Sequence, residues 1–325
     1  MIIPLAGKGT RLRPHTHLTP KPMLRVAGRP VIDWVMDRLA GLHIEELIFI
    51  TGHLKDQVEE YARARYDIPS RFIEQRVQDG TAGAVNLARS HVRGPVLIIF
   101  VDTVFEADLS IAETTTADGV IWAKEVDDYQ RFGVVVTDDQ GYMTRIVEKP
   151  STPVSKLANI GLYFVRDVDA LWRGIDHVLK TAPNKGEYYL TDAFQHMIDH
   201  GSKILTAAVG GWYDCGQLET TLETNGTLLE HGAARHPTVG ADVRLVEPVL
   251  IAENCTLERC TIGPNVSIEG GTAIRDAAVA HAIIGADCTI EGSTLTHAML
   301  GARVRVTDFT GSGTFGADSE IAGRP

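Results

Sequence analysis

The residues best suited to chemistry lie at the amino terminus, where Gly7-Lys8-Gly9-Thr10 follows the short apolar run Met1–Leu5. A glycine-rich turn after a buried strand lets backbone N–H groups approach a ligand without a side-chain clash. Four cations lie in or soon after this turn: Lys8, Arg11, Arg13 and Lys21. Together these features predict an anion site, and the anion we expect is a nucleoside triphosphate.

Two common phosphate-binding templates do not fit this turn. The P-loop has four residues between its first glycine and Gly-Lys-Ser/Thr, and the dinucleotide fingerprint has Gly or Ala where Leu12 stands. A second stretch, Leu18-Thr-Pro-Lys-Pro-Met-Leu24, follows in register. The two stretches together resemble the signature of the sugar-1-phosphate nucleotidylyltransferases, Gly-x-Gly-Thr-Arg-Leu-x-Pro followed by Pro-Lys-Pro-Met/Leu-Leu.

The resemblance implies roles for the residues of both stretches. Arg11 would contact the departing β- and γ-phosphates, and Lys21 the α-phosphate or the attacking sugar phosphate, so both are expected to be catalytic. Arginine suits forked binding of phosphate and lysine acts as a point charge. Arg25 departs from the family, which usually has proline there. The nucleotide-binding residues implied in the turn are Leu5, Ala6, Gly7, Gly9, Thr10 and Arg11.

Two aspartates are the expected metal ligands and catalytic carboxylates. Asp102 follows the apolar strand predicted at 96–101, and ligands collect at the carboxyl ends of strands in open α/β sheets. The family has a metal-binding Asp there after glycine, which Val101 replaces. Trp212-Tyr-Asp-Cys-Gly216 resembles the family's Trp-x-Asp-x-Gly element, so Asp214 is the second expected ligand. Carboxylate oxygens suit Mg²⁺, and we expect the two residues to converge on one ion.

The segment Gln75–Ala84 resembles the part of the family that recognises the base. Gln75 would pair with a pyrimidine edge, since an amide offers both a donor and an acceptor. Gly80 and Thr81 would lie against the base and ribose, and Gln78 is a rival for the role of Gln75. This resemblance favours uracil or thymine over guanine or adenine as the base.

Three further motifs follow in the family's order and imply the sugar-phosphate site. Glu148-Lys149-Pro150 resembles the Glu-Lys-Pro element, whose Glu accepts sugar hydroxyls and whose Lys binds the sugar phosphate. Asn159-Ile-Gly161 resembles the next sugar-binding turn. Glu187, with Thr191-Asp192, resembles the Gly-Glu-x-x-Leu-Thr-Asp stretch.

Hydrophobic periodicity predicts strands alternating with helices up to about residue 230, hence an α/β, Rossmann-like mixed sheet that is largely parallel. From residue 119 the pattern shifts toward strand, as in a substrate-binding insert. Thr191 is expected to cap the last of these helices, and Gly201 to end it. The predicted helices are 31–42, 56–66, 81–91, 168–175 and 192–200. The predicted strands are 46–51, 71–75, 94–101, 120–126, 133–137, 145–150 and 160–165.

After about residue 235 a short unit recurs, with an apolar residue, glycine and a turn-forming pair, as in Ile262-Gly-Pro-Asn-Val266 and Ile284-Gly-Ala-Asp-Cys288. It resembles the hexapeptide repeat of left-handed parallel β-helices, and about 90 residues predict four or five coils. We therefore expect a nucleotidyltransferase domain at 1–230 and a β-helix domain at 236–325. Such helices often stack on a copy of themselves, so a homo-oligomer is expected.

Composition limits the remaining possibilities. The 325 residues carry a net charge of −11 and no run of Lys or Arg, which argues against a nucleic-acid partner. No apolar run is long enough for a membrane span and no secretory signal is evident. The four cysteines lack Cys-x-x-Cys spacing and are expected to be reduced thiols in a cytoplasmic protein.

The leading interpretation is Mg²⁺-dependent transfer of a nucleotidyl group from dTTP or UTP to glucose 1-phosphate, releasing pyrophosphate. Mannose 1-phosphate with GTP is the next substrate pair, and N-acetylglucosamine 1-phosphate a third sugar. The attacking phosphate oxygen is already ionised, so no general base is expected.

Two other functional classes stay open. The β-helix could add acyl transfer through His281 or His297, although the helix is short and nothing after Pro325 would complete a site. A non-catalytic regulatory subunit is the other. The residues that such a subunit typically loses are present and favour activity: Arg11, Lys21, Asp102, Lys149 and Asp214.

Overall fold

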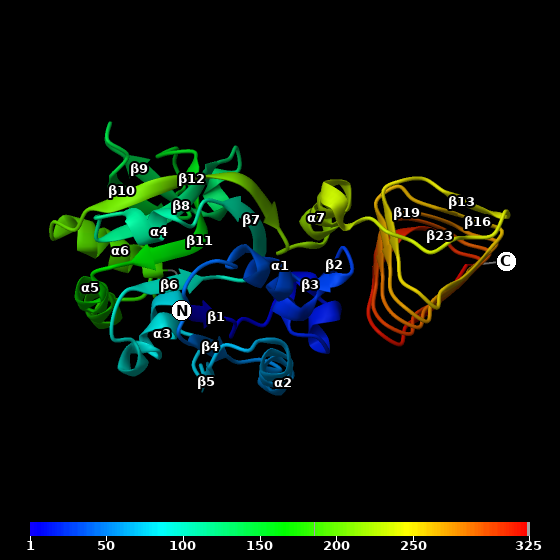
Figure 1. Cartoon of the computed structure of the whole chain (residues 1–325), viewed down its shortest axis with the longest axis horizontal. Coiled ribbons are helices and arrows are strands. Elements are labelled where there is room, and N and C mark those ends of the chain that lie inside the picture. Colours follow the sequence, from blue (N-terminus) through cyan, green and yellow to red (C-terminus); the bar gives the residue numbers. More distant parts are fainter. Residues whose placement is uncertain (185, 324–325) are drawn as a thin grey trace. The chain divides into compact units, whose positions relative to one another are not determined.

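The computed structural model describes residues 1–184 and 186–323, so the last two residues of the predicted β-helix domain lie outside it. The chain forms two compact units (Figure 1). The first comprises Met1–Lys8 and Val35–Trp212, and the second comprises Gly9–Trp34 and Tyr213–Pro325. The glycine-rich turn is thus divided, with Gly7 and Lys8 in the first unit and Gly9 and Thr10 in the unit that contains the repeats. The domain boundary predicted between residues 230 and 236 stays a prediction.

A ten-stranded mixed sheet forms the centre of the first unit, in the order β5-β4-β1-β6-β11-β8-β12-β7, with β9 and β10 paired beside β11. Strand β1 runs parallel to β4 and β6, whereas β11 runs antiparallel to β6 and β8. The strands are β1 (Ile2–Pro4), β4 (Leu47–Thr51), β5 (Ser70–Glu74), β6 (Val96–Ile99), β7 (Thr103–Ala107), β8 (Gly119–Glu125), β9 (Gly133–Thr137), β10 (Met143–Glu148), β11 (Leu157–Val165) and β12 (Ile204–Asp214).

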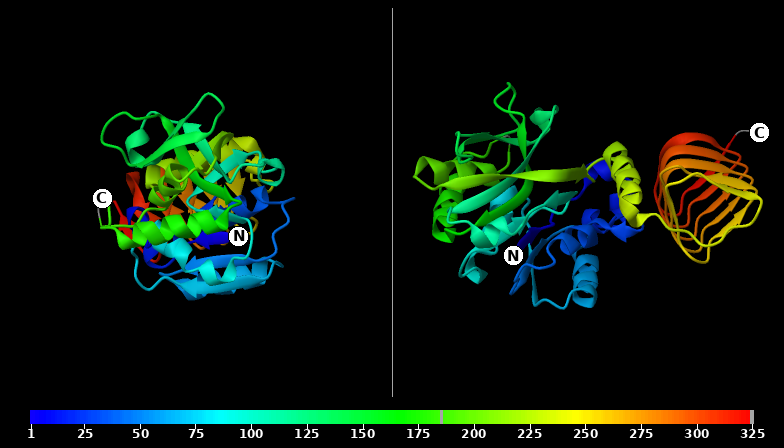
Figure 2. Two further views of the ribbon diagram at one scale, coloured as in Figure 1. Left: turned by 90° about the vertical axis from the view of Figure 1, so that its left-hand side faces the viewer. Right: turned by 45° about the horizontal axis from the view of Figure 1, so that its top comes forward.

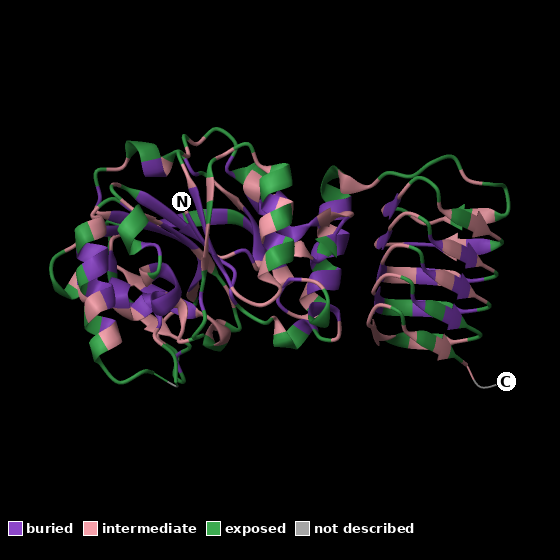
Figure 3. Cartoon of the chain, turned by 90° about the horizontal axis from the view of Figure 1, so that it is seen from below, coloured by how far each residue is buried: buried purple, intermediate pink, exposed green. Residues whose placement is uncertain are grey.

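Helices pack on this sheet and complete its core. They are α2 (Lys55–Arg65), α3 (Thr81–Asn86), α4 (Ile111–Thr114), α5 (Val168–Lys180) and α6 (Leu190–Asp199). Helix α1 (Val31–Arg38) begins in the second unit and ends in the first. The apolar faces of α5 and α6 meet each other, and Phe194 of α6 stacks on Tyr163 of β11 with ring centroids 5.0 Å apart. Burial of each large side chain in this core contributes about 1.5–3 kcal/mol. Figure 3 shows buried residues along the sheet strands and on parts of the helices.

Predicted and observed elements agree in kind and differ at their ends. The helix predicted at 81–91 is shorter, because a separate 3-10 turn, Arg89–His91, follows α3. The predicted cap at Thr191 is wrong. Thr191 lies inside α6, and its hydroxyl donates to Glu148 rather than to the helix's own backbone. Strands β7 and β12 were not predicted, and β8 to β12 join the same sheet as β1.

The second unit contains a parallel β-solenoid, together with the hairpin β2 (Arg25–Val26) and β3 (Arg29–Pro30) and helix α7 (Leu218–Leu228) (Figure 2). Its strands form a seven-stranded and a five-stranded sheet, and the latter gives one strand for each of five coils. These strands are β13 (Val243–Leu245), β14 (Val249–Ile251), β15 (Thr256–Glu258), β16 (Cys260–Ile262), β17 (Val266–Ile268), β18 (Ala273–Arg275), β19 (Ala278–Ile284), β20 (Thr289–Glu291), β21 (Thr294–Leu300), β22 (Arg305–Thr307), β23 (Thr310–Phe315) and β24 (Glu320–Ala322).

The repeat unit predicted from the sequence forms the corners of the solenoid. Its fourth residue takes a left-handed backbone conformation, with φ of 61° at Asn265, 56° at Asp287 and 63° at Asp318. Asn and Asp adopt this conformation more readily than most residues, which explains their place in the unit. The apolar residues beside these corners point inward and form a continuous core.

The four cysteines are free thiols, as predicted, and three of them are buried. No helix in the described part of the chain has the length and apolar character needed to cross a membrane.

Candidate active site

The predicted sugar-side residues of the first unit come together on three neighbouring strands. Glu148 ends β10 and Asn159 lies in β11, while Gly133 begins β9 between them. The Asn159 amide donates to the Gly133 carbonyl at 2.9 Å. A Cβ on Gly133 would meet that amide, and it would lie 2.9 Å from Glu148 Oε2, so only glycine leaves room for both side chains.

Tyr163 fixes the orientation of Asn159. Both lie on one face of β11, and the Tyr163 hydroxyl donates to Asn159 Oδ1 at 2.5 Å. The Gly161 N–H donates to the same oxygen at 3.2 Å. Burial raises the pKa of Tyr163, and the charges of Glu148 and Asp102 raise it further. The Tyr163 phenol therefore stays protonated. It lies within electrostatic range of Glu148, a predicted sugar-side carboxylate, and of Asp102, a predicted metal ligand.

Glu148 is held from two sides. Thr191 donates to Oε2 at 3.1 Å, and Lys149 Nζ lies 3.4 Å from Oε1. Burial raises the pKa of Glu148, while Lys149 and Thr191 oppose the rise. Lys149 Nζ also lies 5.0 Å from the centre of the Tyr189 ring, and Tyr189 in turn hydrogen-bonds Glu187. Side-chain contacts thus link Glu148, Lys149 and Glu187, and their role in binding a sugar phosphate stays a prediction.

The predicted base-recognition loop joins the first part of the glycine-rich turn. The Gln78 amide donates to the Ala6 carbonyl at 2.6 Å. The Gln75 amide nitrogen donates to Asp79 Oδ1 at 2.9 Å and to the Gly80 carbonyl at 3.2 Å. Gln75 is buried, and its amide N–H groups bond to residues of its own loop. Its Oε1 is therefore the atom suited to accept a hydrogen bond from a ligand.

The base loop also connects to the sugar-side cluster. A Cβ on Gly80 would collide with the backbone of Tyr188, and the Ala82 N–H donates to the Tyr188 carbonyl at 2.9 Å. The Thr81 hydroxyl accepts from the Leu190 N–H at 2.8 Å, one residue before Thr191. Hydrogen bonds and short chain segments together therefore connect Ala6 to Glu148 within the first unit.

Asp102 lies in a half-buried turn between β6 and β7. Strand β6 ends at Ile99 rather than at the predicted Val101, because the chain turns at Val101 and Asp102. The Phe100 N–H makes one more bond before the turn, to the Gly161 carbonyl at 2.9 Å. Asp102 is thus brought to the same region as Tyr163 and Asn159.

The remaining part of the phosphate turn lies in the second unit. Gly9 has a φ of 59°, and a Cβ there would lie 2.9 Å from Thr16 Cγ2 and 3.1 Å from Lys21 Cβ. The Thr16 hydroxyl donates to the Gly9 carbonyl at 2.8 Å. The turn therefore packs directly on the segment that carries Lys21, while Arg11 and Thr10 are exposed in a 3-10 turn, Thr10–Leu12.

Asp214 ends β12 in the second unit. Its Oδ1 accepts from the Gly216 N–H at 2.8 Å, and its carbonyl accepts from the Thr224 hydroxyl at 2.9 Å. These bonds fix the half-buried carboxylate. As hard oxygen donors, Asp102 and Asp214 fit Mg²⁺, and their convergence on one ion stays a prediction. The residues that the structure describes contain no cluster of three His, Cys, Asp or Glu side chains arranged to hold a metal.

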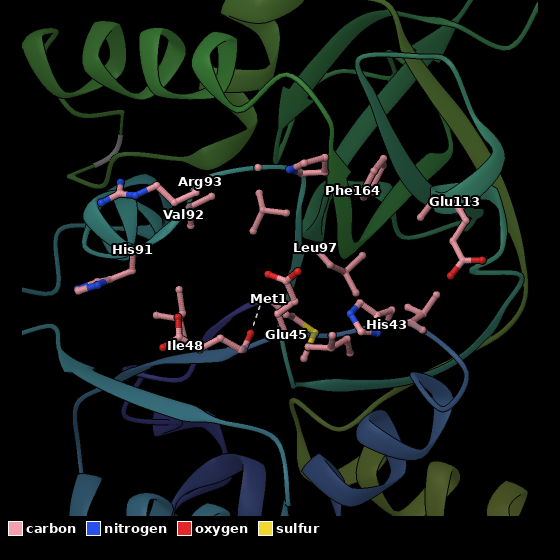
Figure 4. Close-up of a pocket in the computed structure, with 17 residues that line it drawn as sticks. Met1, His43, Glu45, Ile48, His91, Val92, Arg93, Leu97, Glu113 and Phe164 are labelled. Atoms are coloured by element: carbon pink, nitrogen blue, oxygen red, sulfur yellow. Dashed lines mark hydrogen bonds between the residues drawn. The ribbon is translucent and has the colours of Figure 1, made fainter.

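A cavity of about 430 Å³ lies at the other edge of the parallel strands, near the starts of β1, β4 and β6 (Figure 4). The Met1 amino group donates to the Glu46 carbonyl at 2.7 Å there. None of the predicted site residues lines this cavity, so it is separate from the candidate site.

The sequence motifs missed two residues of this site, Gly133 and Tyr163, and they named Thr191 without predicting its bond to Glu148. Tyr163 follows Asn159 by four residues on a strand, and such even spacing puts both on one face, so that signal was available. For Gly133 the sequence carries no comparable signal.

Comparison with known proteins adds to this geometry. A family model described as nucleotidyl transferase matches residues 1–231. The chain belongs to the nucleotidyl transferase family. The family predicted from the two amino-terminal stretches is thereby confirmed.

Relatives in this family have named activities. The UTP–glucose-1-phosphate uridylyltransferase AglF of Haloferax volcanii is 32% identical over 70% of this chain and 96% of its own. A glucose-1-phosphate thymidylyltransferase of Streptomyces antibioticus is 29% identical over 93% of this chain and 86% of its own. The bifunctional protein GlmU of Methanococcus aeolicus is 32% identical over 85% of this chain. The matched region spans only 60% of the length of that relative.

Solved structures support the fold. UDP-glucose pyrophosphorylase in complex with UDP-glucose superposes with a TM-score of 0.63, over 71% of this chain and 98% of that one, at 22% identity. The same enzyme without ligand gives a TM-score of 0.62. At this identity the likeness is evidence for the fold alone.

Proposed function

We propose that the protein transfers a nucleotidyl group from dTTP or UTP to glucose 1-phosphate, giving a nucleotide-sugar and pyrophosphate. The observation that carries this proposal is the match to family members with these two activities, one of them along 93% of this chain. The hydrogen-bonded path from Ala6 through the base loop to Glu148 supports it, because it joins the residues expected to bind the nucleotide and the sugar.

In the proposed reaction a phosphate oxygen of glucose 1-phosphate attacks the α-phosphorus of the triphosphate. The bond from that phosphorus to the oxygen bridging to the β-phosphorus breaks, and pyrophosphate leaves. Arg11 binds the departing phosphates and Lys21 the α-phosphate, so that positioning and charge supply most of the acceleration. Glu148 and Asn159 hold the sugar hydroxyls, and Lys149 binds its phosphate.

Asp102 and Asp214 are the residues that would hold Mg²⁺. The ion would neutralise charge that develops on the phosphate oxygens. Gly216 supports this role, since its N–H orients the Asp214 carboxylate through Oδ1.

The proposed preference for a pyrimidine rests on Gln75. Its amide nitrogen is committed to Asp79 and Gly80, which leaves Oε1 as an acceptor for the N3–H of uracil or thymine. A guanylyltransferase acting on mannose 1-phosphate is the runner-up, and the uridylyl- and thymidylyltransferase relatives favour the pyrimidine.

The decisive experiment measures pyrophosphate release for five nucleoside triphosphates against a panel of sugar 1-phosphates. We expect dTTP or UTP with glucose 1-phosphate to give the highest rate, with an absolute requirement for added Mg²⁺. Asp214→Asn should lower turnover strongly with little change in the midpoint of thermal unfolding. No pyrophosphate from any pair would favour the regulatory subunit.

A second candidate activity, acyl transfer, rests on a cavity of about 540 Å³ within the second unit. His281 and His297 stack there with ring centroids 4.9 Å apart, opposite α7 residues such as Glu223. If this cavity is an acyltransferase site, the protein consumes acetyl-CoA with a sugar phosphate and His281→Ala abolishes the consumption. Absence of turnover in the unaltered protein rejects it.

A homo-oligomer is also proposed, from the general tendency of such solenoids to stack. Mass measurement in solution by light scattering tests it, and a mass equal to that of one chain would contradict it.

A further inference from the structure

The 3-10 turn His15–His17 connects the phosphate turn to the solenoid within the second unit. Thr16 is 1% exposed, and its hydroxyl donates to the Gly9 carbonyl at 2.8 Å. The neighbouring side chain, His15, makes a 2.6 Å hydrogen bond through Nε2 to the Thr314 hydroxyl. Two consecutive side chains thus join Gly9 to strand β23, about 300 residues later in the chain.

The environment of His15 defines the character of this bond. His15 is 7% exposed, and burial lowers its pKa to about 4. The ring is therefore neutral at neutral pH, and its bond to Thr314 joins two uncharged groups. A buried polar group costs free energy when its partner is lost, so the orientation of His15 depends on Thr314.

Apolar and ionic contacts support the same connection. Leu12 and Leu24 pack with Ile283 and Met299 of the solenoid in one buried cluster. Arg25 Nε lies 2.7 Å from Glu269 Oε1. Pro14 packs against Gly316 of the solenoid. The approach is so close that a Cβ on Gly316 would lie 3.1 Å from Pro14 Cβ.

Helix α7 anchors the end of the same segment. The Asn225 Oδ1 accepts from the Ala27 N–H at 2.9 Å and from the Ser267 hydroxyl at 2.8 Å. Asn225 is fully buried, so both bonds are shielded from water. The segment that follows the phosphate turn is therefore fixed to the solenoid at both ends.

We propose that the solenoid positions the phosphate-binding turn through Thr314 and His15, so that a coil near its end determines affinity for the triphosphate. This inference rests on the proposed function, since it takes the turn at Gly9–Arg11 to bind triphosphate. His15 and Thr314 act as positioning residues, because neither is expected to touch the nucleotide. The solenoid would then be part of the nucleotide site as well as a means of assembly.

Thr314→Val is the informative variant, because it removes the hydroxyl and keeps the shape. Thr310→Val is the matched control, since Thr310 lies on the same strand and is exposed. Thr314→Ser keeps a hydroxyl at this position, so it should bind dTTP as the wild type does. Should Thr314→Val fail to fold, His15→Gln tests the same bond from its other side.

The measurements are the Kd for dTTP by calorimetry and the KM for each substrate in pyrophosphate release. We expect Thr314→Val to raise both the Kd and the KM for dTTP about tenfold, equivalent to a bond of about 1.4 kcal/mol. The KM for the sugar phosphate should change less than twofold. If Thr314→Val binds dTTP as tightly as the wild type, the inference is overturned. The proposed function then still stands, provided that the wild-type protein releases pyrophosphate. A wild-type protein that binds no triphosphate overturns both.

Discussion

The sugar-side cluster and the phosphate turn are positioned in different ways. Glu148, Asn159 and Gly133 lie on adjacent strands of one sheet, and the segment 133–192 contains nearly all their contacts. The phosphate turn after Gly9 lies in a different compact unit, where the side chains that fix it bond to residues as distant as Thr314. Strand register determines the first region, whereas contact with a repeat structure determines the second.

This difference predicts which changes affect which substrate. A substitution in the sugar-side cluster of Glu148, Asn159 and Gly133 should weaken sugar-phosphate binding and leave triphosphate binding unaffected. A substitution in the last coils of the solenoid should do the reverse. Variants that affect both substrates equally would remove the distinction between the two regions.

The largest expected effect concerns the pH dependence of the second region. His15 takes up its proton near pH 6.5 when unfolded and near pH 4 when folded, because burial lowers its pKa to about 4. Between these values the unfolded state binds more protons, so the free energy of unfolding falls as the pH drops from about 7 to 4. Titration of His15 lowers the free energy of unfolding by about 3 kcal/mol over this range, with no further decrease below pH 4.

Denaturant unfolding of the wild type and of His15→Gln at several pH values checks this prediction. The difference between the two proteins should depend on pH only between about 4 and 7. A difference that is constant across this range would show that His15 is not buried as a neutral ring.

Gly133→Ala should have the next largest effect. The added Cβ meets the Asn159 amide and lies 2.9 Å from Glu148 Oε2, so both sugar-binding side chains must move. Displacement of such groups by about 1 Å costs about 100-fold in rate. We expect that loss in kcat/KM for glucose 1-phosphate, with the Kd for dTTP unchanged.

Gly210→Ala is the control for this variant, since a Cβ there meets nothing closer than 3.6 Å on the same sheet. If Gly133→Ala retained full activity, the assignment of Asn159 and Glu148 to the sugar site would be wrong.

Tyr163→Phe should have a smaller effect in the same region. It removes the hydroxyl that donates to Asn159 Oδ1 and leaves the Gly161 N–H bond in place. Loss of one hydrogen bond of about 1.4 kcal/mol predicts a tenfold rise in KM for the sugar phosphate with kcat nearly constant. A fall in kcat with KM unchanged would instead assign Tyr163 a role in the chemical step.

In both regions the sequence predicted what local spacing determines and missed what only the folded chain brings together. The alternating elements, the repeat and the motifs at Glu148 and Asn159 were recognisable because local spacing determines them. Thr191 was misassigned as a cap because the carboxylate that its hydroxyl meets belongs to another strand. No local pattern reveals that Thr314 contacts His15, since that contact exists only after the solenoid has formed.

Strands β7 and β12 were missed for a related reason. Thr103–Ala107 is short and follows a turn, and Ile204–Asp214 mixes small and polar residues that lack a clear alternation. Their pairing partners, rather than their own sequences, make them strands. Asp214 was nonetheless singled out as a candidate ligand, because its motif is independent of the secondary structure around it.

The most direct test of this account is a matrix of initial rates in which both substrates are varied for Gly133→Ala and Thr314→Val. We predict that Gly133→Ala impairs use of glucose 1-phosphate alone and that Thr314→Val raises the KM for dTTP alone. Equal changes in both substrates for either variant would contradict it.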